Sequence, residues 1–177
     1  NTLAATTLMK GLGYELKDIA QSVTSLTSVP GRFQQYRSSN GWTAIIDYAH
    51  TPDALDKVLN ATHAILPKNN NGRIITIFGA GGDRDTTKRP MMGSVASAMS
   101  DVVILTSDNP RSELPEKIIQ DIATGIPPST VLFIEVNRRD AIQLGLTMAK
   151  QNDIIVIAGK GHEEYQIIGN EKHHFSD

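Results

Sequence analysis

The chain has 177 residues, with 17 Lys and Arg against 19 Asp and Glu, a formal net charge of −2 and no cysteine. This balance argues against a nucleic-acid surface, and the lack of cysteine excludes disulfides and thiolate metal sites. Apolar residues make up 40% of the chain, yet no apolar run approaches the roughly 18 residues that cross a bilayer. We therefore expect a cytoplasmic protein with neither nucleic acid nor a membrane as partner. Separately, we expect a monomer.

Residues 1–28 predict two helices, at 1–10 and 16–26, with too little apolar surface for a core of their own. Val29-Pro30-Gly31-Arg32 is typical of a turn or linker, and we place a domain boundary there. The chain lacks an initiator Met and opens in what looks like mid-helix, so we expect a piece of a longer protein. Residues 1–28 would then end a preceding domain, and residues 29–177 would form the next one.

From residue 43 onward, apolar strands alternate with helices. The predicted strands cover residues 33–37, 42–47, 73–78, 102–106, 131–135 and 154–158. The predicted helices cover residues 53–66, 90–99, 116–124 and 138–150. Asn40-Gly41 indicates a hairpin between the first two strands, and a second small hairpin is expected in the tail, at 165–177. Continuous apolar strands spaced by helices predict a doubly wound, mostly parallel, Rossmann-like α/β sheet.

Four of these strands end in polar loops, at residues 47–52, 79–85, 106–111 and 159–163. The carboxyl ends of parallel strands share one edge of the sheet, which is where open α/β sheets bind ligands. The charged side chains of these loops are Asp47, His50, Asp83, Arg84, Asp85, Asp108, Arg111, Lys160, His162 and Glu163. We interpret their gathering as a small-molecule site rather than as four separate solvated turns.

The loop at 106–111 places a carboxylate, an amide and a guanidinium within four residues, with Pro110 fixing one φ angle between them. Asp108 would take an ammonium group, and Arg111 would clamp a carboxylate through two parallel hydrogen bonds. The alternative is an Asx turn that caps the next helix, with Arg111 in solvent.

The glycine-rich loop at 79–85 fits neither the dinucleotide fingerprint nor the P-loop. It indicates a tight turn that directs Arg84 into the cleft, or else a local pairing of Arg84 with Asp83 or Asp85.

The segment at 159–163 has the composition of an anion-binding turn, in which Glu163 could hold an amine. A zinc site built from His50, His162 and a carboxylate is a further alternative, although the spacing matches no known ligand pattern.

Seven segments, in this order, resemble the Mur ligases of peptidoglycan synthesis. They are N-T-L-A-A at 1–5, V-P-G-R-F-Q at 29–34, D-Y-A-H-T-P-D-A-L at 47–55, F-G-A-G-G-D-R-D at 78–85, K-R-P-M-M-G at 88–93, D-N-P-R at 108–111 and A-G-K-G-H-E at 158–163. Because they span nearly the whole chain, the resemblance is specific. D-N-P-R resembles the recognition motif of the family members that add meso-diaminopimelate, whose lysine-adding relatives lack the arginine.

The resemblance implies a three-domain, ATP- and Mg²⁺-dependent amide ligase. Such an enzyme phosphorylates the γ-carboxylate of UDP-N-acetylmuramoyl-L-alanyl-D-glutamate, and the amine of meso-diaminopimelate then displaces phosphate. Residues 1–28 would be the helical end of the central ATP-binding domain, and residues 29–177 the C-terminal, amino-acid-binding domain. The P-loop and the magnesium ligands would lie upstream, so this chain would carry no catalytic residue and no metal ligand and would not ligate by itself.

The resemblance also implies residue roles. Those carried over by motif to meso-diaminopimelate are Arg84, Asp108, Asn109, Pro110, Arg111, Gly159 and Glu163. Those carried over to ATP are Asn1, at the adenine, with Arg32 and Asp47 at the phosphates and ribose. The alternatives are a lysine-adding or other Mur-type ligase, against which Arg111 argues, and a stand-alone amino-acid-binding module, against which the coreless first helices argue.

Overall fold

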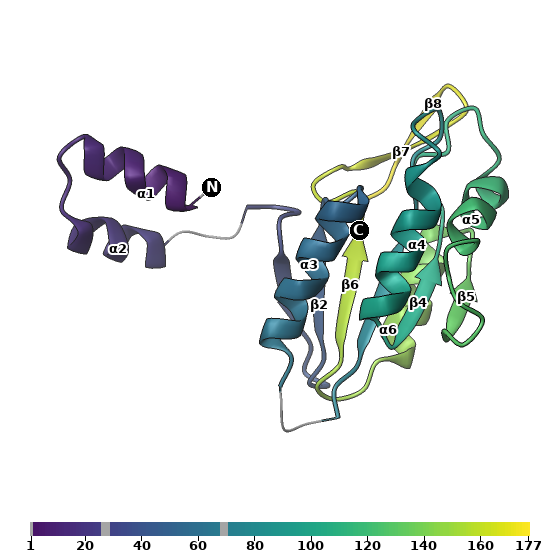
Figure 1. Cartoon of the computed structure of the whole chain (residues 1–177), viewed down its shortest axis with the longest axis horizontal. Coiled ribbons are helices and arrows are strands. Elements are labelled where there is room, and N and C mark those ends of the chain that lie inside the picture. Colours follow the sequence, from purple (N-terminus) through teal and green to yellow (C-terminus); the bar gives the residue numbers. More distant parts are fainter. Residues whose placement is uncertain (1, 26–28, 68–70) are drawn as a thin grey trace.

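A computed structural model describes residues 2–25, 29–67 and 71–177, and its main feature is a six-stranded sheet of order β1-β2-β6-β3-β4-β5 (Figure 1). The strands are β1 (Gln34–Arg37), β2 (Thr43–Asp47), β3 (Ile74–Phe78), β4 (Val102–Leu105), β5 (Leu132–Ile134) and β6 (Ile154–Ala158). β1 runs antiparallel to β2, and every other neighbouring pair is parallel. The predicted doubly wound, mostly parallel sheet and its first hairpin are confirmed.

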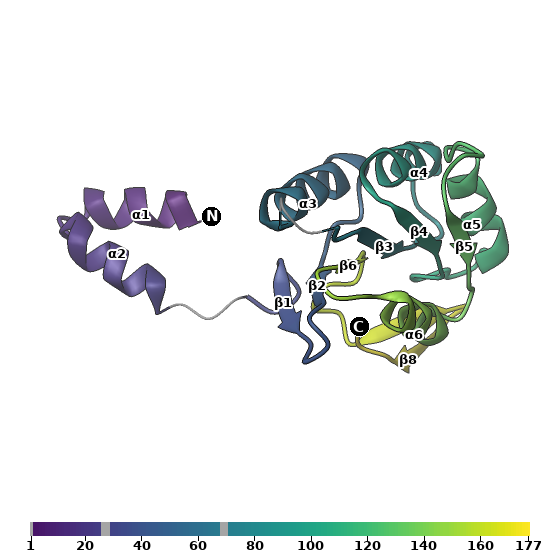
Figure 2. The ribbon, with the colours of Figure 1, turned by 90° about the horizontal axis from the view of Figure 1, so that it is seen from below.

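Helices cover both faces of the sheet, as Figure 2 shows along the strands. α3 (Pro52–Ile65), α4 (Lys88–Met99) and α5 (Pro115–Ala123) lie on one face, and α6 (Arg138–Met148) lies on the other. Every residue of β3 and β6 is buried, which explains why these strands are continuously apolar rather than alternating. In α6, a Cβ at Gly145 would lie 2.6 Å from the Ile77 side chain, so the glycine lets the helix approach the sheet closely.

The residues at the N-termini of α3 and α4 explain where these helices begin. The hydroxyl of Thr51 accepts a hydrogen bond from the N–H of Ala54 at 3.2 Å and caps α3, whose first residue is Pro52. α4 begins two residues before the predicted start, so Pro90 is its third residue. Proline is tolerated there because the first four N–H groups of a helix have no partner within the helix.

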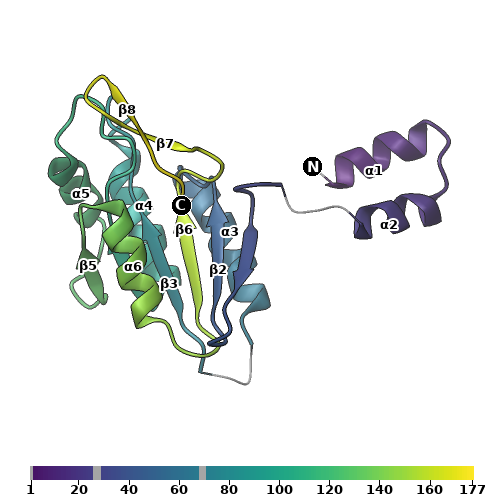
Figure 3. The same ribbon diagram turned by 180° about the vertical axis from the view of Figure 1, so that it is seen from behind.

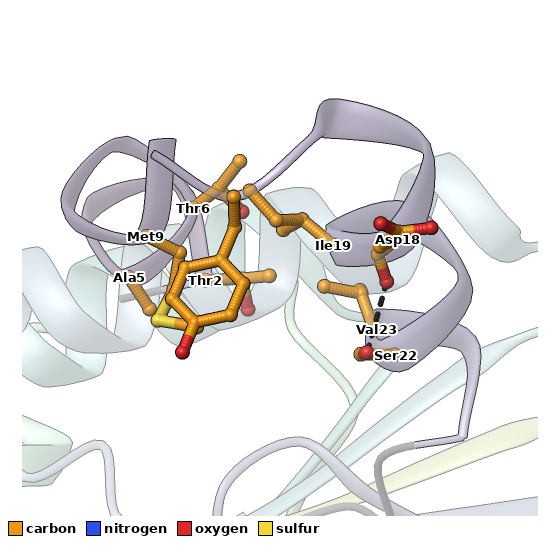
Figure 4. A pocket seen from close by; sticks show the side chains of 9 residues that line it. Thr2, Ala5, Thr6, Met9, Asp18, Ile19, Ser22 and Val23 are labelled. Atoms are coloured by element: carbon orange, nitrogen blue, oxygen red, sulfur yellow. Dashed lines mark hydrogen bonds between the residues drawn. The ribbon is translucent and has the colours of Figure 1, made fainter. Parts of the chain in front are cut away.

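Two short helices, α1 (Thr2–Gly11) and α2 (Leu16–Thr24), contact each other and stand apart from the sheet in Figure 1. The expected end of the second helix, residue 26, lies outside the described residues. An apolar pocket of about 260 Å³ lies between the two helices, lined by Met9, Ile19 and Val23 among others (Figure 4). Residues 2–25 supply no strand to either sheet. The division into residues 1–28 and 29–177 stays a prediction.

A two-stranded hairpin, β7 (Tyr165–Ile168) and β8 (Glu171–His174), lies at the carboxyl end of the main sheet (Figure 3). This confirms the hairpin expected in the tail, with Gly169 at φ 59° in its turn. The N–H of Arg111 donates to the carbonyl of Ile167 at 3.1 Å, so the hairpin is fastened to the loop after β4. Over the described ranges, no helix has the length and apolar character of a membrane span.

Candidate functional site

A cavity of about 270 Å³ opens at the carboxyl edge of the sheet, among the loops that follow β2, β3, β4 and β6. These strands are direct neighbours, which is why loops far apart in sequence meet there. The residues that line the cavity are Tyr48, His50, Thr51, Gly81, Arg84, Lys88, Asp108, Asn109, Arg111, Gly159 and Glu163. All the residues predicted for meso-diaminopimelate line it except Pro110, which is buried.

Asp108 lies at the buried end of the cavity wall, where it is 5% exposed. Burial raises the pKa of its carboxyl group, while Arg138 and Lys160 act in the opposite direction. Its Oδ2 would lie 2.9 Å from a Cβ at Gly159, whose φ of 119° also disfavours any side chain. Gly159 therefore keeps the space in front of this carboxylate open.

Asn109 uses its side-chain amide to hold other parts of the site. Its Nδ2 donates to Oε2 of Glu163 at 2.9 Å, and its Oδ1 accepts from the N–H of Ile167 at 2.9 Å. The hydroxyl of Tyr48 approaches Oε1 of Glu163 at 3.5 Å. Asn109 thus joins the loop after β6, the loop after β4 and the β7–β8 hairpin.

Arg111 is half-buried and lines the cavity, in a left-handed backbone conformation with φ 53°. Its Nη1 donates to the carbonyl of Gly82 at 2.8 Å. The next helix is capped by Leu114 without a side-chain hydrogen bond, so the alternative of an Asx-turn cap with a solvated Arg111 is wrong.

Arg84 is exposed at the rim of the cavity, and its Nη1 donates to the carbonyl of Asp83 at 3.0 Å. The Asp83 carboxylate accepts from the hydroxyl of Ser112 at 2.6 Å, and that of Asp85 accepts from the hydroxyl of Thr87 at 2.6 Å. Within the described part of the chain, Arg84 makes no ion pair with either aspartate, but it bonds locally to the carbonyl of Asp83 and also lines the cavity. Its role in ligand binding stays a prediction.

Two of the residues predicted for ATP, Arg32 and Asp47, do not line this cavity. Both carboxylate oxygens of Asp47 accept backbone N–H groups, from Phe33 and Ala49, at 2.8 Å each. Phe33 has φ 47°, so Asp47 holds a strained turn beside Arg32. The exposed Arg32 guanidinium stacks 4.5 Å above the Tyr48 ring. Asn1 lies outside the described residues.

The histidines of the zinc alternative flank the ring of Tyr48, with centroid distances of 4.7 Å for His50 and 5.3 Å for His162. Among the residues that the structure describes, no group of three or more His, Asp and Glu side chains is arranged to hold a metal ion.

Two fully buried basic side chains near the site, Arg89 and Arg138, were not predicted from the sequence. Lys160 was expected among the charged side chains of the cleft, but it is fully buried and does not line the cavity. Arg89 donates to both oxygens of Glu113 at 2.8 Å, which lowers the pKa of that carboxyl group to about 2. Glu113 in turn accepts from the N–H of Asp83 at 2.7 Å, so this pair anchors the glycine-rich loop. Arg89 lies in the motif K-R-P-M-M-G and Lys160 in A-G-K-G-H-E. The charge of a residue alone, however, does not predict that its side chain is buried.

The cavity wall carries charges of both signs: the cations Arg84, Lys88 and Arg111 and the anions Asp108 and Glu163. Lys88 donates from Nζ to the carbonyl of His50 at 3.1 Å, and burial lowers its pKa. Such a wall is complementary to a small zwitterion that carries both ammonium and carboxylate groups.

Comparison with known proteins identifies the family of the chain. Residues 31–161 match the family model described as "Mur ligase, glutamate ligase domain". A UDP-N-acetylmuramoyl-L-alanyl-D-glutamate–2,6-diaminopimelate ligase of Fusobacterium nucleatum is 50% identical over the whole chain, which spans 36% of that protein. A solved structure of a ligase with the same name has a TM-score of 0.77 and 40% identity, covering 98% of this chain and 35% of that one.

A more distant structure, E. coli FolC in complex with ADP, has a TM-score of 0.67 at 21% identity and covers 91% of this chain and 36% of that one. At that identity the likeness concerns the fold alone. The chain spans about a third of the length of the curated relatives it matches. With more than half of its residues in the family match, this chain belongs to the Mur ligase family.

Proposed function

We propose that this chain is the amino-acid-binding part of an ATP-dependent ligase that joins meso-diaminopimelate to UDP-N-acetylmuramoyl-L-alanyl-D-glutamate. The observation that carries the proposal is the cavity wall, which combines guanidinium groups from the loops after β3 and β4 with carboxylates from the loops after β4 and β6. Relatives at 50% and 45% identity over the whole chain bear the name of that ligase, and this supports the same assignment.

The charges of meso-diaminopimelate, two ammonium and two carboxylate groups, are distributed over the wall as follows. Arg111 pairs with the distal carboxylate that lysine lacks, since a guanidinium matches a carboxylate through two parallel hydrogen bonds. Asp108 and Glu163 take the adjacent ammonium, and Gly159 leaves room for it. Arg84, at the exposed rim, holds the other carboxylate.

The reaction requires a nucleophilic amine next to an activated acyl group. ATP supplies the phosphoryl group that activates the γ-carboxylate of D-glutamate. The second amine of the bound amino acid then forms the amide bond as phosphate leaves and a proton is lost. The role of this chain is orientation, because fixing the amino acid at both ends turns an encounter of two molecules into a reaction within one complex.

For ATP itself, Arg32 presents an exposed guanidinium that can pair with phosphate. Asp47 already accepts two backbone hydrogen bonds, so its contribution is to shape the turn that presents Arg32. The remaining phosphate contacts, the Mg²⁺ ligands and the site for the UDP-sugar are proposed to lie upstream of this chain, and Asn1 at the adenine.

The test is a coupled phosphate-release assay on the full-length protein that contains this chain, with ATP, UDP-N-acetylmuramoyl-L-alanyl-D-glutamate and either meso-diaminopimelate or lysine. We expect phosphate release and amide product with meso-diaminopimelate, at a kcat/KM at least a hundredfold above that for lysine, about what one bidentate charge-assisted pair provides. A preference for lysine, or no product with either amino acid, would contradict the proposal.

A further inference from the structure

Lys160 lies directly behind the carboxylates of the proposed amine site. Its side chain is 0% exposed, and it does not line the cavity. Its Nζ lies 3.3 Å from Oδ1 of Asn109, 3.4 Å from Oε2 of Glu163 and 3.7 Å from Oδ1 of Asp108. A single buried ammonium therefore contacts three of the side chains assigned to the ligand while staying out of the ligand's reach.

The distances show that Asn109, Glu163 and Asp108 share the ammonium of Lys160. Charge-assisted N–H···O hydrogen bonds are shortest at about 2.7–2.9 Å, and all three contacts of Lys160 are longer than that. Lys160 contacts Oδ1 of Asp108 and Oε2 of Glu163, and the second oxygen of each carboxylate has other neighbours. Oδ2 of Asp108 faces Gly159, and Oε1 of Glu163 faces the hydroxyl of Tyr48; both of those residues line the cavity.

Lys160 is not the only cation near Asp108 in the described part of the chain, because Arg138 and Lys160 both lower the pKa of the Asp108 carboxyl group, Arg138 by more. Arg138 acts on Asp108 through space, but its Nε and Nη2 donate to the Asp177 carboxylate at 2.6 Å each, so its charge is already paired. Lys88 faces Asp108 from α4, and Glu163 adds a like charge. The cluster of Asp108, Glu163 and Lys160, taken by itself, has two carboxylates for one ammonium, so it can accept one further ammonium from a ligand.

We propose that Lys160 is a positioning residue for the amine site: its ammonium holds Asp108, Asn109 and Glu163 in place from behind and keeps both carboxylates ready for the ligand's ammonium. This inference rests on the proposed function. It predicts that removing the Lys160 ammonium weakens the binding of every amino acid that presents an ammonium to this site, without changing which amino acid is preferred.

The experiment replaces Lys160 by Met in the full-length protein. Met keeps a similar length without the charge, and Lys57→Met, on the exposed side of α3, is the matched control. We expect the KM for meso-diaminopimelate to rise about tenfold or more in Lys160→Met, as for the loss of one charge-assisted contact, while the control stays within about twofold. The KM values for ATP and for the UDP-linked substrate should also stay within about twofold, because Lys160 touches neither proposed site.

Two further readouts separate positioning from a general loss of structure. The ratio of kcat/KM for meso-diaminopimelate to that for lysine should be unchanged in Lys160→Met, since both ligands carry the ammonium. In addition, the fall of 1/KM for meso-diaminopimelate at low pH should begin at a higher pH. Asp108 loses a neighbouring cation, which raises the pKa of its carboxyl group. The other charges around it remain: the cations Arg138 and Lys88 and the anions Glu163 and Asp177.

An unchanged KM for meso-diaminopimelate in the folded variant, or a parallel rise of the KM for all three substrates, would overturn the inference. If Lys160→Met does not fold, Lys160→Gln, which keeps a donor without the charge, is measured in the same way and judged by the same outcomes. A wild-type enzyme that does not use meso-diaminopimelate refutes the proposed function instead, so the two failures are distinguishable.

Discussion

Nη1 of Arg111 donates a hydrogen bond to the carbonyl of Gly82 at 2.8 Å and so ties the loop after β4 to the loop after β3. A second bond, from the N–H of Gly82 to the carbonyl of Asn109 at 2.9 Å, joins the same loops. A Cβ at Gly82 would lie 1.8 Å from the carbonyl oxygen of Pro110, so only glycine permits this approach. The guanidinium is thereby held at the cavity wall before any ligand binds, which lowers the entropy lost on binding.

Arg111→Ala should strongly lower kcat/KM for meso-diaminopimelate and leave the low kcat/KM for lysine nearly unchanged. A bidentate pair with a carboxylate contributes on the order of 1.5–3 kcal/mol per hydrogen bond, so a hundredfold loss in kcat/KM is expected. Arg111→Lys should not restore activity, because an ammonium cannot form the two parallel bonds. The measurement is kcat/KM for both amino acids. Arg37→Ala, on the exposed edge strand β1, serves as the control, and an unchanged ratio in Arg111→Ala would mean that another residue discriminates.

Gly159→Ala should impair amino-acid binding more than its cost in stability explains. The new Cβ would lie 2.9 Å from Oδ2 of Asp108 and would push this carboxylate out of place. Gly169→Ala is the matched control, because Gly169 also has a positive φ, 59°, but nothing lies within 4 Å of its Cβ position. Both variants should lose stability through backbone strain of about 1–2 kcal/mol. Only Gly159→Ala should raise the KM for meso-diaminopimelate, and equal KM values in the two variants would refute this role.

Glu113 should contribute to acid denaturation between about pH 4.5 and pH 2. Arg89 holds the pKa of the Glu113 carboxyl group at about 2 in the folded chain, against 4.5 as its ordinary value. Because the folded pKa is the lower one, the stabilisation is fully present above pH 4.5 and is lost as the pH falls through 2. The free energy of unfolding of Glu113→Gln should therefore lie below that of the wild type at pH 7, and the two should converge towards pH 2. Urea unfolding at a series of pH values measures this. Glu116→Gln, exposed on α5, is the control, and a gap that stays constant down to pH 2 would contradict the assignment.

Substitutions of Arg32 and Asp47 should have different effects, although the same resemblance assigns both residues to ATP. The first should affect nucleotide binding and the second stability. Arg32→Ala should raise the KM for ATP in the full-length protein and change the free energy of unfolding little, since the guanidinium is exposed on the Tyr48 ring. Asp47→Ala should lower stability by about 1–3 kcal/mol, because it leaves the N–H groups of Phe33 and Ala49 without their acceptor. Steady-state kinetics with ATP and urea unfolding test the two effects. A stable Asp47→Ala variant with a raised KM for ATP would show instead that its carboxylate acts on the nucleotide.

The sequence predicted where the loops would form a cavity, because loops that follow neighbouring parallel strands must meet at one edge. Arg84, Asp108 and Arg111 come from two such loops, and all three line the cavity. It did not predict the role of Asn109, whose amide holds Glu163 and the β7–β8 hairpin, because those partners are more than 50 residues away along the chain.

By itself, the sequence determined the order of strands and helices, the parallel sheet and the family, since apolar runs, glycine and proline signals and short motifs are local features of the chain. Only the tertiary structure decided the environment of each charge. Arg89, Arg138 and Lys160 are ordinary basic residues in the sequence, yet their side chains are fully buried. Their acidic partners are Glu113 and Asp121 for Arg89, Asp177 for Arg138, and Asp108 and Glu163 for Lys160. The physical reason is that burying a charge is favourable only with a partner in place, and for most of these pairs the partner arrives from a distant segment when the chain folds.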